Sequence, residues 1–198
     1  MKIILGSQSK ARKEVLERMG VSFEIMSADI DEKSIRREDA KELTMAIARA
    51  KADVLLRDIQ EPAILITADT VNVCNRKIRE KAETLEQAAD FLREYAVHPL
   101  QTVTAVVVTN TTTHEQKEGV DIVDVWFRSI PEEVIRSMVS RPDITSFAGA
   151  FAFQDPLQRE YVDHFEGEEE SILGLPKALT LFLLKEIGAI DLLINNLS

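Results

Sequence analysis

The spacing of apolar residues along the chain predicts strands that alternate with helices. Residues 120–128 alternate between apolar and polar side chains, which is typical of a strand with one buried face. In residues 9–19 the apolar side chains recur every four positions instead, as on one face of a helix that ends at Gly20. By the same reasoning we expect strands at 2–6, 22–26, 64–67, 71–74 and 102–109, and helices at 38–57, 84–95, 131–139 and 176–187.

Strands and helices that interleave in this way favour an α/β fold. The two long strands at 102–109 and 120–128 could pair as an antiparallel hairpin, which would make the sheet mixed. A short apolar segment follows Gly188 and would either dock on the domain or lie at a subunit interface. The chain has no repeat, low-complexity stretch or obvious flexible linker, so we expect a single domain over residues 1–198.

Composition and charge exclude several classes of protein. Hydrophobic residues make up 45% of the 198 residues, which excludes intrinsic disorder, and no run approaches the roughly 20 apolar residues of a membrane span. The first residues are too short a stretch for a secretory signal, and the single cysteine cannot form an internal disulfide, so we expect a cytoplasmic protein. The net charge of −10 disfavours nucleic acids and anionic membranes as partners, but a few placed cations could still hold a small anion.

The first candidate for such a site is the turn between the first strand and the first helix. Lys10, Arg12 and Lys13 stand in the first helical turn, behind Ser7 and Ser9. A helix N-terminus carries roughly half a positive charge, so cations there are unfavourable unless an anion joins them. The alternative is that Ser9 only caps the helix and the cations point to water.

Two further charged features allow two interpretations each. The acidic loop with Asp29, Asp31 and Glu32 is either a solvated surface or a site where carboxylates share a cation such as Mg²⁺. Lys51 interrupts an apolar row of the long helix. Its ammonium group either reaches the surface along its aliphatic stem or contacts an anion at the edge of the core.

Asp69 follows an apolar run, and ligands of α/β sheets gather near the carboxyl ends of strands. A partly desolvated carboxylate there would have a raised pKa, which suits a general base, although it could also cap a turn with Thr70.

Lys81 lies in a charged stretch that could be a solvated loop. In the segment 147–154, Gln154 follows small and aromatic residues, and its amide could read a nucleobase or satisfy backbone groups.

The order of these motifs resembles the Maf family, the house-cleaning nucleoside triphosphate pyrophosphatases. The family begins with S-x-S-P-R-R, followed by D-I-D-E, a K-A pair, A-D-T, a later lysine, A-G-A-Y-x-x-Q and G-L-P. The match covers about residues 2–187. In this chain the motifs stand at Ser7 to Arg12, Asp29 to Glu32, Lys51-Ala52, Ala68 to Thr70, Lys81, Ala148 to Gln154 and Gly174 to Pro176.

The resemblance implies hydrolysis of a nucleoside triphosphate to a monophosphate and pyrophosphate. Asp69 would accept the proton of the attacking water, and Glu32, with Asp69, would bind a divalent metal such as Mg²⁺, Mn²⁺ or Co²⁺. Thr70 and Gln154 match positions tied to substrate choice, and a glutamine at 154 is typical of the branch that acts on dTTP and UTP, with modified nucleotides as the other class considered. The residues implied to hold the triphosphate are Ser7, Ser9, Arg12, Lys51 and Lys81.

The resemblance also implies an architecture and a set of partners. The fold would be a mixed central α/β sheet flanked by helices, with a cleft between two lobes, as in inosine triphosphate pyrophosphatases. The nucleotide would be the principal partner, and the protein could form a homodimer, while the net charge argues against nucleic acid and membrane as partners.

The chain departs from the family pattern at several positions. Lys10 replaces the proline and Ala11 the first arginine of S-x-S-P-R-R, and a lysine is not a planar fork like arginine. Ala82 replaces a proline, Phe151 a tyrosine, and Asp155 a glycine, which adds a carboxylate that could disfavour a triphosphate. These losses motivate an alternative, a non-catalytic nucleotide-binding or regulatory protein on the same fold. A third interpretation is an interaction protein acting through its apolar C-terminal segment.

Overall fold

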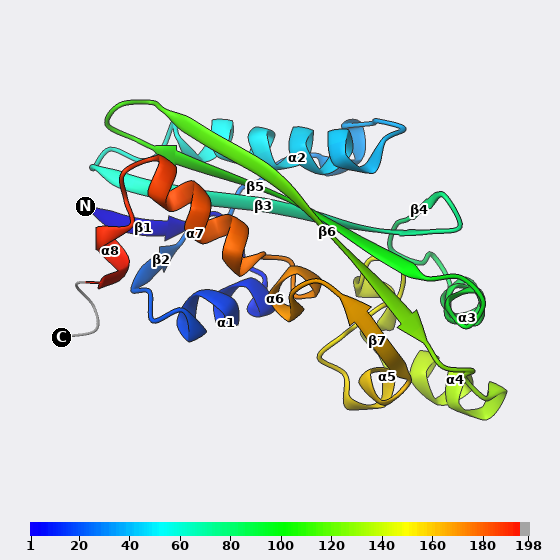
Figure 1. Ribbon diagram of the computed structural model, residues 1–198. Helices are drawn as coiled ribbons and strands as arrows, with labels where there is room; N and C mark the ends of the chain where they lie inside the picture. Colours follow the sequence, from blue (N-terminus) through cyan, green and yellow to red (C-terminus); the bar gives the residue numbers. More distant parts are fainter. Residues whose placement is uncertain (195–198) are drawn as a thin grey trace. The chain divides into compact units, whose positions relative to one another are not determined.

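The computed structural model describes residues 1–194 of the chain, with side chains described through residue 192 (Figure 1). The strands are β1 (Lys2–Leu5), β2 (Phe23–Ile25), β3 (Ala63–Cys74), β4 (Lys77–Arg79), β5 (Leu100–Asn110), β6 (Gln116–Phe127) and β7 (Val162–Glu166). The α-helices are α1 (Lys10–Arg18), α2 (Ala40–Leu55), α3 (Leu85–Tyr95), α4 (Glu132–Val139), α5 (Pro156–Glu160), α6 (Glu169–Ile172), α7 (Lys177–Glu186) and α8 (Asp191–Ile194). Two 3-10 turns, η1 (Glu32–Ser34) and η2 (Ile144–Ser146), complete the described elements.

The strands form one mixed sheet in the order β2-β1-β3-β5-β6-β7, and β4 pairs with the far end of β3. β1 runs parallel to β2 and to β3, whereas β4 and β7 run antiparallel to their neighbours. β1 after Lys2 and the part of β3 that pairs with it, residues 63–66, are entirely apolar and buried, as parallel strands usually are. The predicted mixed α/β fold is confirmed.

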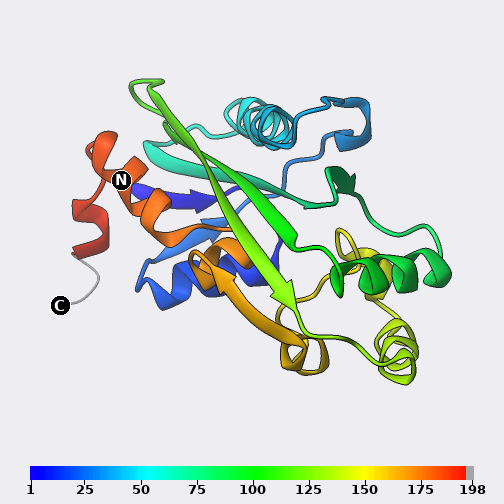
Figure 2. The same ribbon diagram turned by 45° about the vertical axis from the view of Figure 1, so that its right-hand side comes forward.

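The chain divides into two compact units. Unit 1 contains residues 1–70, 104–121 and 169–198, and unit 2 contains residues 71–103 and 122–168. In unit 1, Figures 1 and 2 show α2 on one side of the strands and α1 with α7 on the other. The core under α2 joins Ala48, Ala52 and Leu55 of the helix to apolar side chains of β1, β3 and β5. The predicted cleft between two lobes stays a prediction.

The structure corrects the sequence interpretation around Asp69. The two strands expected at 64–67 and 71–74 are one continuous strand, β3, because Asp69 and Thr70 lie within the sheet and do not form a turn. Asp69 therefore does not follow a strand end of its own. It lies just beyond the register pair Leu5–Ile66, where β1 stops pairing with β3, so one edge of β3 is left free of β1 at this point.

Several short elements were not expected from the pattern, namely η1, η2, β4, β7, α5, α6 and α8. Each spans five residues or fewer, which is too short for a period of 2 or 3.6 to become visible. After Gly188, Ala189 is buried, while the side chains of Leu193 and Ile194, part of the predicted apolar segment, lie outside the described residues. Among the described residues, no helix is long and apolar enough to cross a membrane.

Candidate active site

Hydrogen bonds between residues close in sequence hold the turn between β1 and α1. Ser9 caps α1, because its hydroxyl accepts a hydrogen bond from the backbone N–H of Arg12 at 3.4 Å. The Ser7 hydroxyl accepts from the backbone N–H of Ser9 at 3.2 Å. Lys10 is exposed, and Lys13 pairs with Glu17 at 3.7 Å along the helix surface. Of the three cations expected to surround an anion, these two therefore face outward or toward their own helix.

Arg12, in contrast, is buried and its guanidinium group is held by four hydrogen bonds within unit 1. Nε donates to the carbonyl oxygen of Gly174 at 2.8 Å, and Nη1 donates to the carbonyl oxygen of Ala68 at 2.9 Å. Nη1 also contacts the Ser7 hydroxyl at 3.2 Å, and Nη2 contacts the Thr70 hydroxyl at 3.1 Å. Arg12 thus fixes the start of α1 against β3 and the turn before α7.

Lys51 lies between two carboxylates. Its ammonium nitrogen is 2.7 Å from Asp69 Oδ1 and 2.8 Å from Glu32 Oε1. The side chains of Lys51 and Asp69 are each 10% exposed, whereas that of Glu32 is 50% exposed. The lysine in the apolar row of α2 therefore reaches an anion at the edge of the core, and that anion is Asp69.

The pKa of Asp69 reflects opposing influences. Burial is the strongest and raises the pKa above the ordinary aspartate value, while the charges of Lys51 and Arg12 and the hydrogen bond from Lys51 lower it. The nearby carboxylate of Glu32 raises it further. The balance leaves Asp69 more basic than an exposed aspartate, which suits a group that takes a proton from water.

A chain of hydroxyl groups extends from Arg12 across unit 1. The Thr70 and Thr104 hydroxyls are 2.9 Å apart, and Thr104 reaches the carbonyl oxygen of Ser171 at 3.4 Å. Gly174 closes the network in a left-handed conformation with a φ of +88°. A Cβ atom there would lie 3.0 Å from the Thr70 hydroxyl and 3.3 Å from Arg12 Nε, so the glycine of the G-L-P motif permits this close approach.

Lys81 and Gln154 both belong to unit 2 and are exposed. Lys81 forms an isolated bridge with Ala148, which begins the A-G-A sequence. Tyr95 donates its hydroxyl to the Gly149 carbonyl at 2.6 Å, and Asn72 donates its amide to the Ala148 carbonyl at 2.8 Å. The segment that carries Gln154 is therefore tied to the rest of unit 2 through its backbone.

The extra carboxylate of Asp155 has a structural role. It accepts a hydrogen bond from the backbone N–H of Gln158 at 2.9 Å and so caps α5. It also forms an ion pair with Arg141, and its side chain is only 9% exposed. Its charge is thus compensated within unit 2, which weakens the expectation that it repels a triphosphate.

The predicted residues of unit 1 form two connected groups. Ser7, Arg12 and Thr70 share one hydrogen-bond network, and Lys51, Glu32 and Asp69 share another. The charge of Arg12 acts on Asp69, which links the two groups electrostatically. This arrangement places two buried cations, two carboxylates and several hydroxyls around the start of α1 and the middle of β3. Phosphoryl transfer requires groups of these kinds, because they position the phosphates and neutralise their charge.

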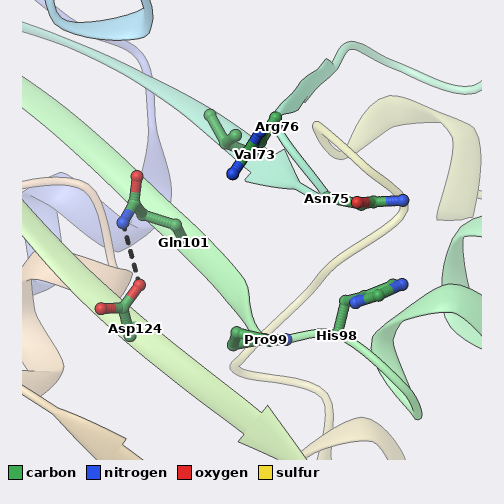
Figure 3. A pocket seen from close by; sticks show the side chains of 7 residues that line it. All are labelled: Val73, Asn75, Arg76, His98, Pro99, Gln101 and Asp124. Atoms are coloured by element: carbon green, nitrogen blue, oxygen red, sulfur yellow. Dashed lines mark hydrogen bonds between the residues drawn. The ribbon is translucent and has the colours of Figure 1, made fainter.

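Unit 2 also has a cavity of about 380 Å³ beyond the end of β3 (Figure 3). The Gln101 amide donates to Asp124 Oδ1 at 3.0 Å across it. The lining has one permanently charged cation, Arg76, and one carboxylate, Asp124, so it lacks the surplus of positive charge that would select a polyphosphate. Its lining, which includes none of the predicted site residues, consists of Val73, Asn75, Arg76, His98, Pro99, Gln101 and Asp124.

Comparison with known proteins agrees with the order of the motifs. The sequence profile of the family described as Maf-like protein matches residues 2–187. The chain belongs to the Maf family. The resemblance expected from the motifs is therefore confirmed.

Relatives of this Maf chain include proteins with named activities. A 7-methyl-GTP pyrophosphatase of Dictyostelium discoideum is 43% identical over 193 residues, which cover 94% of this chain and 97% of the relative. A dTTP/UTP pyrophosphatase of Vibrio vulnificus is 30% identical over 185 residues, which cover 93% and 98%. A solved nucleoside-triphosphatase of Mycobacterium abscessus is 12% identical, with 66% of this chain and 76% of that chain covered and a TM-score of 0.41.

The structure of the Maf chain adds residues that sequence reasoning missed. Thr104 and Gln158 are buried polar side chains with specific backbone or hydroxyl partners. The signal available for Thr104 was a hydroxyl in an apolar strand, because a buried polar group must find a partner. Gln158 lies in a polar stretch of sequence and gave no such signal.

Proposed function

We propose that this Maf chain hydrolyses nucleoside triphosphates to nucleoside monophosphates and pyrophosphate. The observation that carries the proposal is the buried ion pair of Asp69 and Lys51, 2.7 Å apart and under the influence of Arg12. A charged pair so deeply buried is costly for stability alone, which makes it a candidate for function. The names of the relatives, pyrophosphatases of 7-methyl-GTP and of dTTP/UTP, support the same reaction.

Each residue has a role that follows from its chemistry. Asp69 takes the proton of the attacking water, because burial raises its pKa and the charges of Lys51 and Arg12 oppose only part of that rise. Lys51 holds Asp69 in place and supplies a positive charge for the phosphates. The hydroxyls of Ser7, Ser9 and Thr70 would donate hydrogen bonds to the substrate, and Lys81 would add a second flexible cation.

A divalent metal fits the donor set. Glu32 and Asp69 contact the same ammonium group, so the two carboxylates lie close together, and a metal would bind the oxygen atoms that do not face Lys51. Oxygen ligands suit Mg²⁺, Mn²⁺ or Co²⁺, and such an ion supplies a lowered pKa for bound water and charge neutralisation for the phosphates. Within residues 1–194 no cluster of three or more His, Cys, Asp or Glu side chains is arranged to hold a metal by itself. The two carboxylates would therefore supply only part of the ligand set, and the phosphates of the substrate would complete it.

The substrate base has two candidates, each with its own support. The relative at 43% identity is named for 7-methyl-GTP, which favours a modified nucleotide. The glutamine at 154 favours dTTP and UTP, the substrates named for relatives near 30% identity. We place 7-methyl-GTP first because its relative is 43% identical to this chain and the dTTP/UTP pyrophosphatase 30%, over nearly the same share of the chain.

The test measures pyrophosphate released from 7-methyl-GTP, dTTP, UTP, GTP and ATP with Mg²⁺ or Mn²⁺. We expect turnover of at least one of these nucleotides, and loss of turnover in Asp69→Asn with nucleotide binding by calorimetry retained. Wild-type binding without product from any nucleotide would favour the non-catalytic alternative. Ala11→Arg is a companion variant, because it restores the arginine of the family motif and a large gain in turnover would show that the missing charge limits the reaction.

Three further expectations complete the proposal. The 198 residues act as a single Maf-like domain, the protein operates in the cytoplasm, and it forms a homodimer. The dimer is tested by mass in solution, with and without the residues after Gly188.

A further inference from the structure

The segment that carries Gln154 has an unusual backbone. Gly149 has a φ of +61° and Ala150 a φ of +53°, so two consecutive residues adopt the left-handed conformation. Alanine rarely does so, because its Cβ approaches the following carbonyl oxygen. Such a conformation persists only where surrounding groups hold it, so the hydrogen-bond partners of this backbone determine its shape.

Gln158 is one of those groups. Its side chain is fully buried, its Nε2 donates to the Ala150 carbonyl at 3.0 Å, and its Oε1 accepts from the Ala152 N–H at 2.9 Å. The amide thus bonds the backbone on both sides of Phe151. One bond uses the donor of the amide and the other its acceptor, so a side chain that lacks either group loses at least one of them.

The same residue also holds the chain on the far side of Gln154. The Asp155 backbone N–H donates to the Ala152 carbonyl at 2.9 Å, so residues 152–155 form a turn with exposed Gln154 in its third position. Ala152, at one end of the turn, bonds the Gln158 side chain, and Asp155, at the other end, bonds the Gln158 backbone N–H at 2.9 Å. The Gln158 side chain therefore fixes the end of the turn at Ala152, whereas the end at Asp155 is held by a backbone N–H that any residue at position 158 would offer.

We propose that Gln158 is a positioning residue that fixes where Gln154 is presented and thereby sets the nucleobase preference of the enzyme. The inference rests on the proposed pyrophosphatase function. Gln158 does not contact the substrate and takes no part in the chemical step. Its loss therefore weakens base recognition, which appears in KM and in the ratio of kcat/KM between nucleotides, and leaves kcat nearly unchanged.

The test compares Gln158→Met, which keeps the length and removes both side-chain hydrogen bonds, with Gln158→Glu, whose carboxyl group, protonated in this fully buried position, can still accept from the Ala152 N–H and donate to the Ala150 carbonyl. With the preferred nucleotide we expect KM to rise by roughly tenfold in the methionine variant and by less in the glutamate variant, with kcat within about twofold. Thr180→Val is the matched control, because Thr180 is also fully buried and loses one hydrogen bond, to the Pro176 carbonyl at 2.6 Å in unit 1.

A second comparison separates positioning from general damage to the fold. Gln154→Ala alone should reduce the base preference, and adding Gln158→Met to it should reduce the preference no further, because both act through the same contact. If Gln158→Met folds and keeps the KM and preference of the wild type, the proposal is overturned. If Gln158→Met does not fold, Gln158→Glu takes its place, alone and combined with Gln154→Ala, at a pH high enough to ionise the glutamate, and unchanged KM and preference there overturn the proposal. A wild type inert on every nucleotide overturns the proposed function, and this proposal with it, whereas an active wild type with unaffected variants overturns this proposal alone.

Discussion

Replacing Lys51 by methionine tests whether the ammonium group keeps Asp69 ionised. The two charged atoms are 2.7 Å apart, so their attraction is about 1.5 kcal/mol even with the dielectric constant of bulk water, and larger in a buried site. One pKa unit corresponds to about 1.4 kcal/mol. In Lys51→Met the protonated form of Asp69 therefore persists to a higher pH, and we expect the acid limb of the kcat profile to move upward by at least about one pH unit.

The same substitution has a bounded effect on stability. An unpaired buried carboxylate can escape its penalty by binding a proton, which at pH 7 costs about 4 kcal/mol for an aspartate of ordinary pKa. Burial already raises the pKa of Asp69 in the wild type, so the stability lost relative to the wild type is smaller than this limit. In folded Lys51→Met the pKa of Asp69 is higher than in the wild type. The stability of the variant relative to the wild type therefore falls as the pH rises and recovers in acid.

The assay is pyrophosphate release at saturating nucleotide and metal, measured from pH 4.5 to 9. Lys41→Met is the control, because Lys41 lies on the same helix, α2, and is exposed. Its profile should coincide with that of the wild type. An acid limb in Lys51→Met that stays in place, or moves to lower pH, would refute the reasoning.

Three other variants test the site and its supports. Burial raises the pKa of Asp69 in the folded state, so its contribution to stability is present below the ordinary aspartate pKa and is lost as the pH rises through the raised pKa. The free energy of unfolding in urea should therefore depend less on pH over that interval in Asp69→Asn than in the wild type. Equal pH dependence in the two proteins would contradict the shift. Arg12→Met leaves two buried carbonyl groups without their donors and should lower the free energy of unfolding by about 2–5 kcal/mol, and a loss below about 1 kcal/mol would show that the guanidinium is not a structural tie. Gly149→Ala would place a Cβ close to the Tyr95 hydroxyl and should cost about 2 kcal/mol or more, part of which Tyr95→Phe should restore in thermal unfolding unless the contact is not the cause.

The sequence allowed the charged centre of the site to be predicted, for a physical reason. A lysine in an apolar helical row and an aspartate after an apolar strand both violate the local pattern, and buried charges are retained only with partners. Lys51 and Asp69 prove to be partners of each other. Patterns of this kind name the residues but not the contact, because the two positions lie on different elements.

Other parts of the site could not be predicted from the sequence. Asp155 is an extra carboxylate in the motif, and only the fold brings Arg141 against it. Arg12 was expected to bind an anion, and only the folded chain shows backbone carbonyls of two distant segments as its acceptors. The glycine of G-L-P and the glutamine at 158 likewise depend on what approaches them in space.

The division of the chain has a consequence for how this protein can evolve. The boundaries of the two units fall at 70/71, 103/104, 121/122 and 168/169, so neither unit is one stretch of chain and the first boundary lies within β3. Exchange of one contiguous gene segment with a relative therefore replaces only part of a unit or parts of both, so neither unit can be inherited as a module.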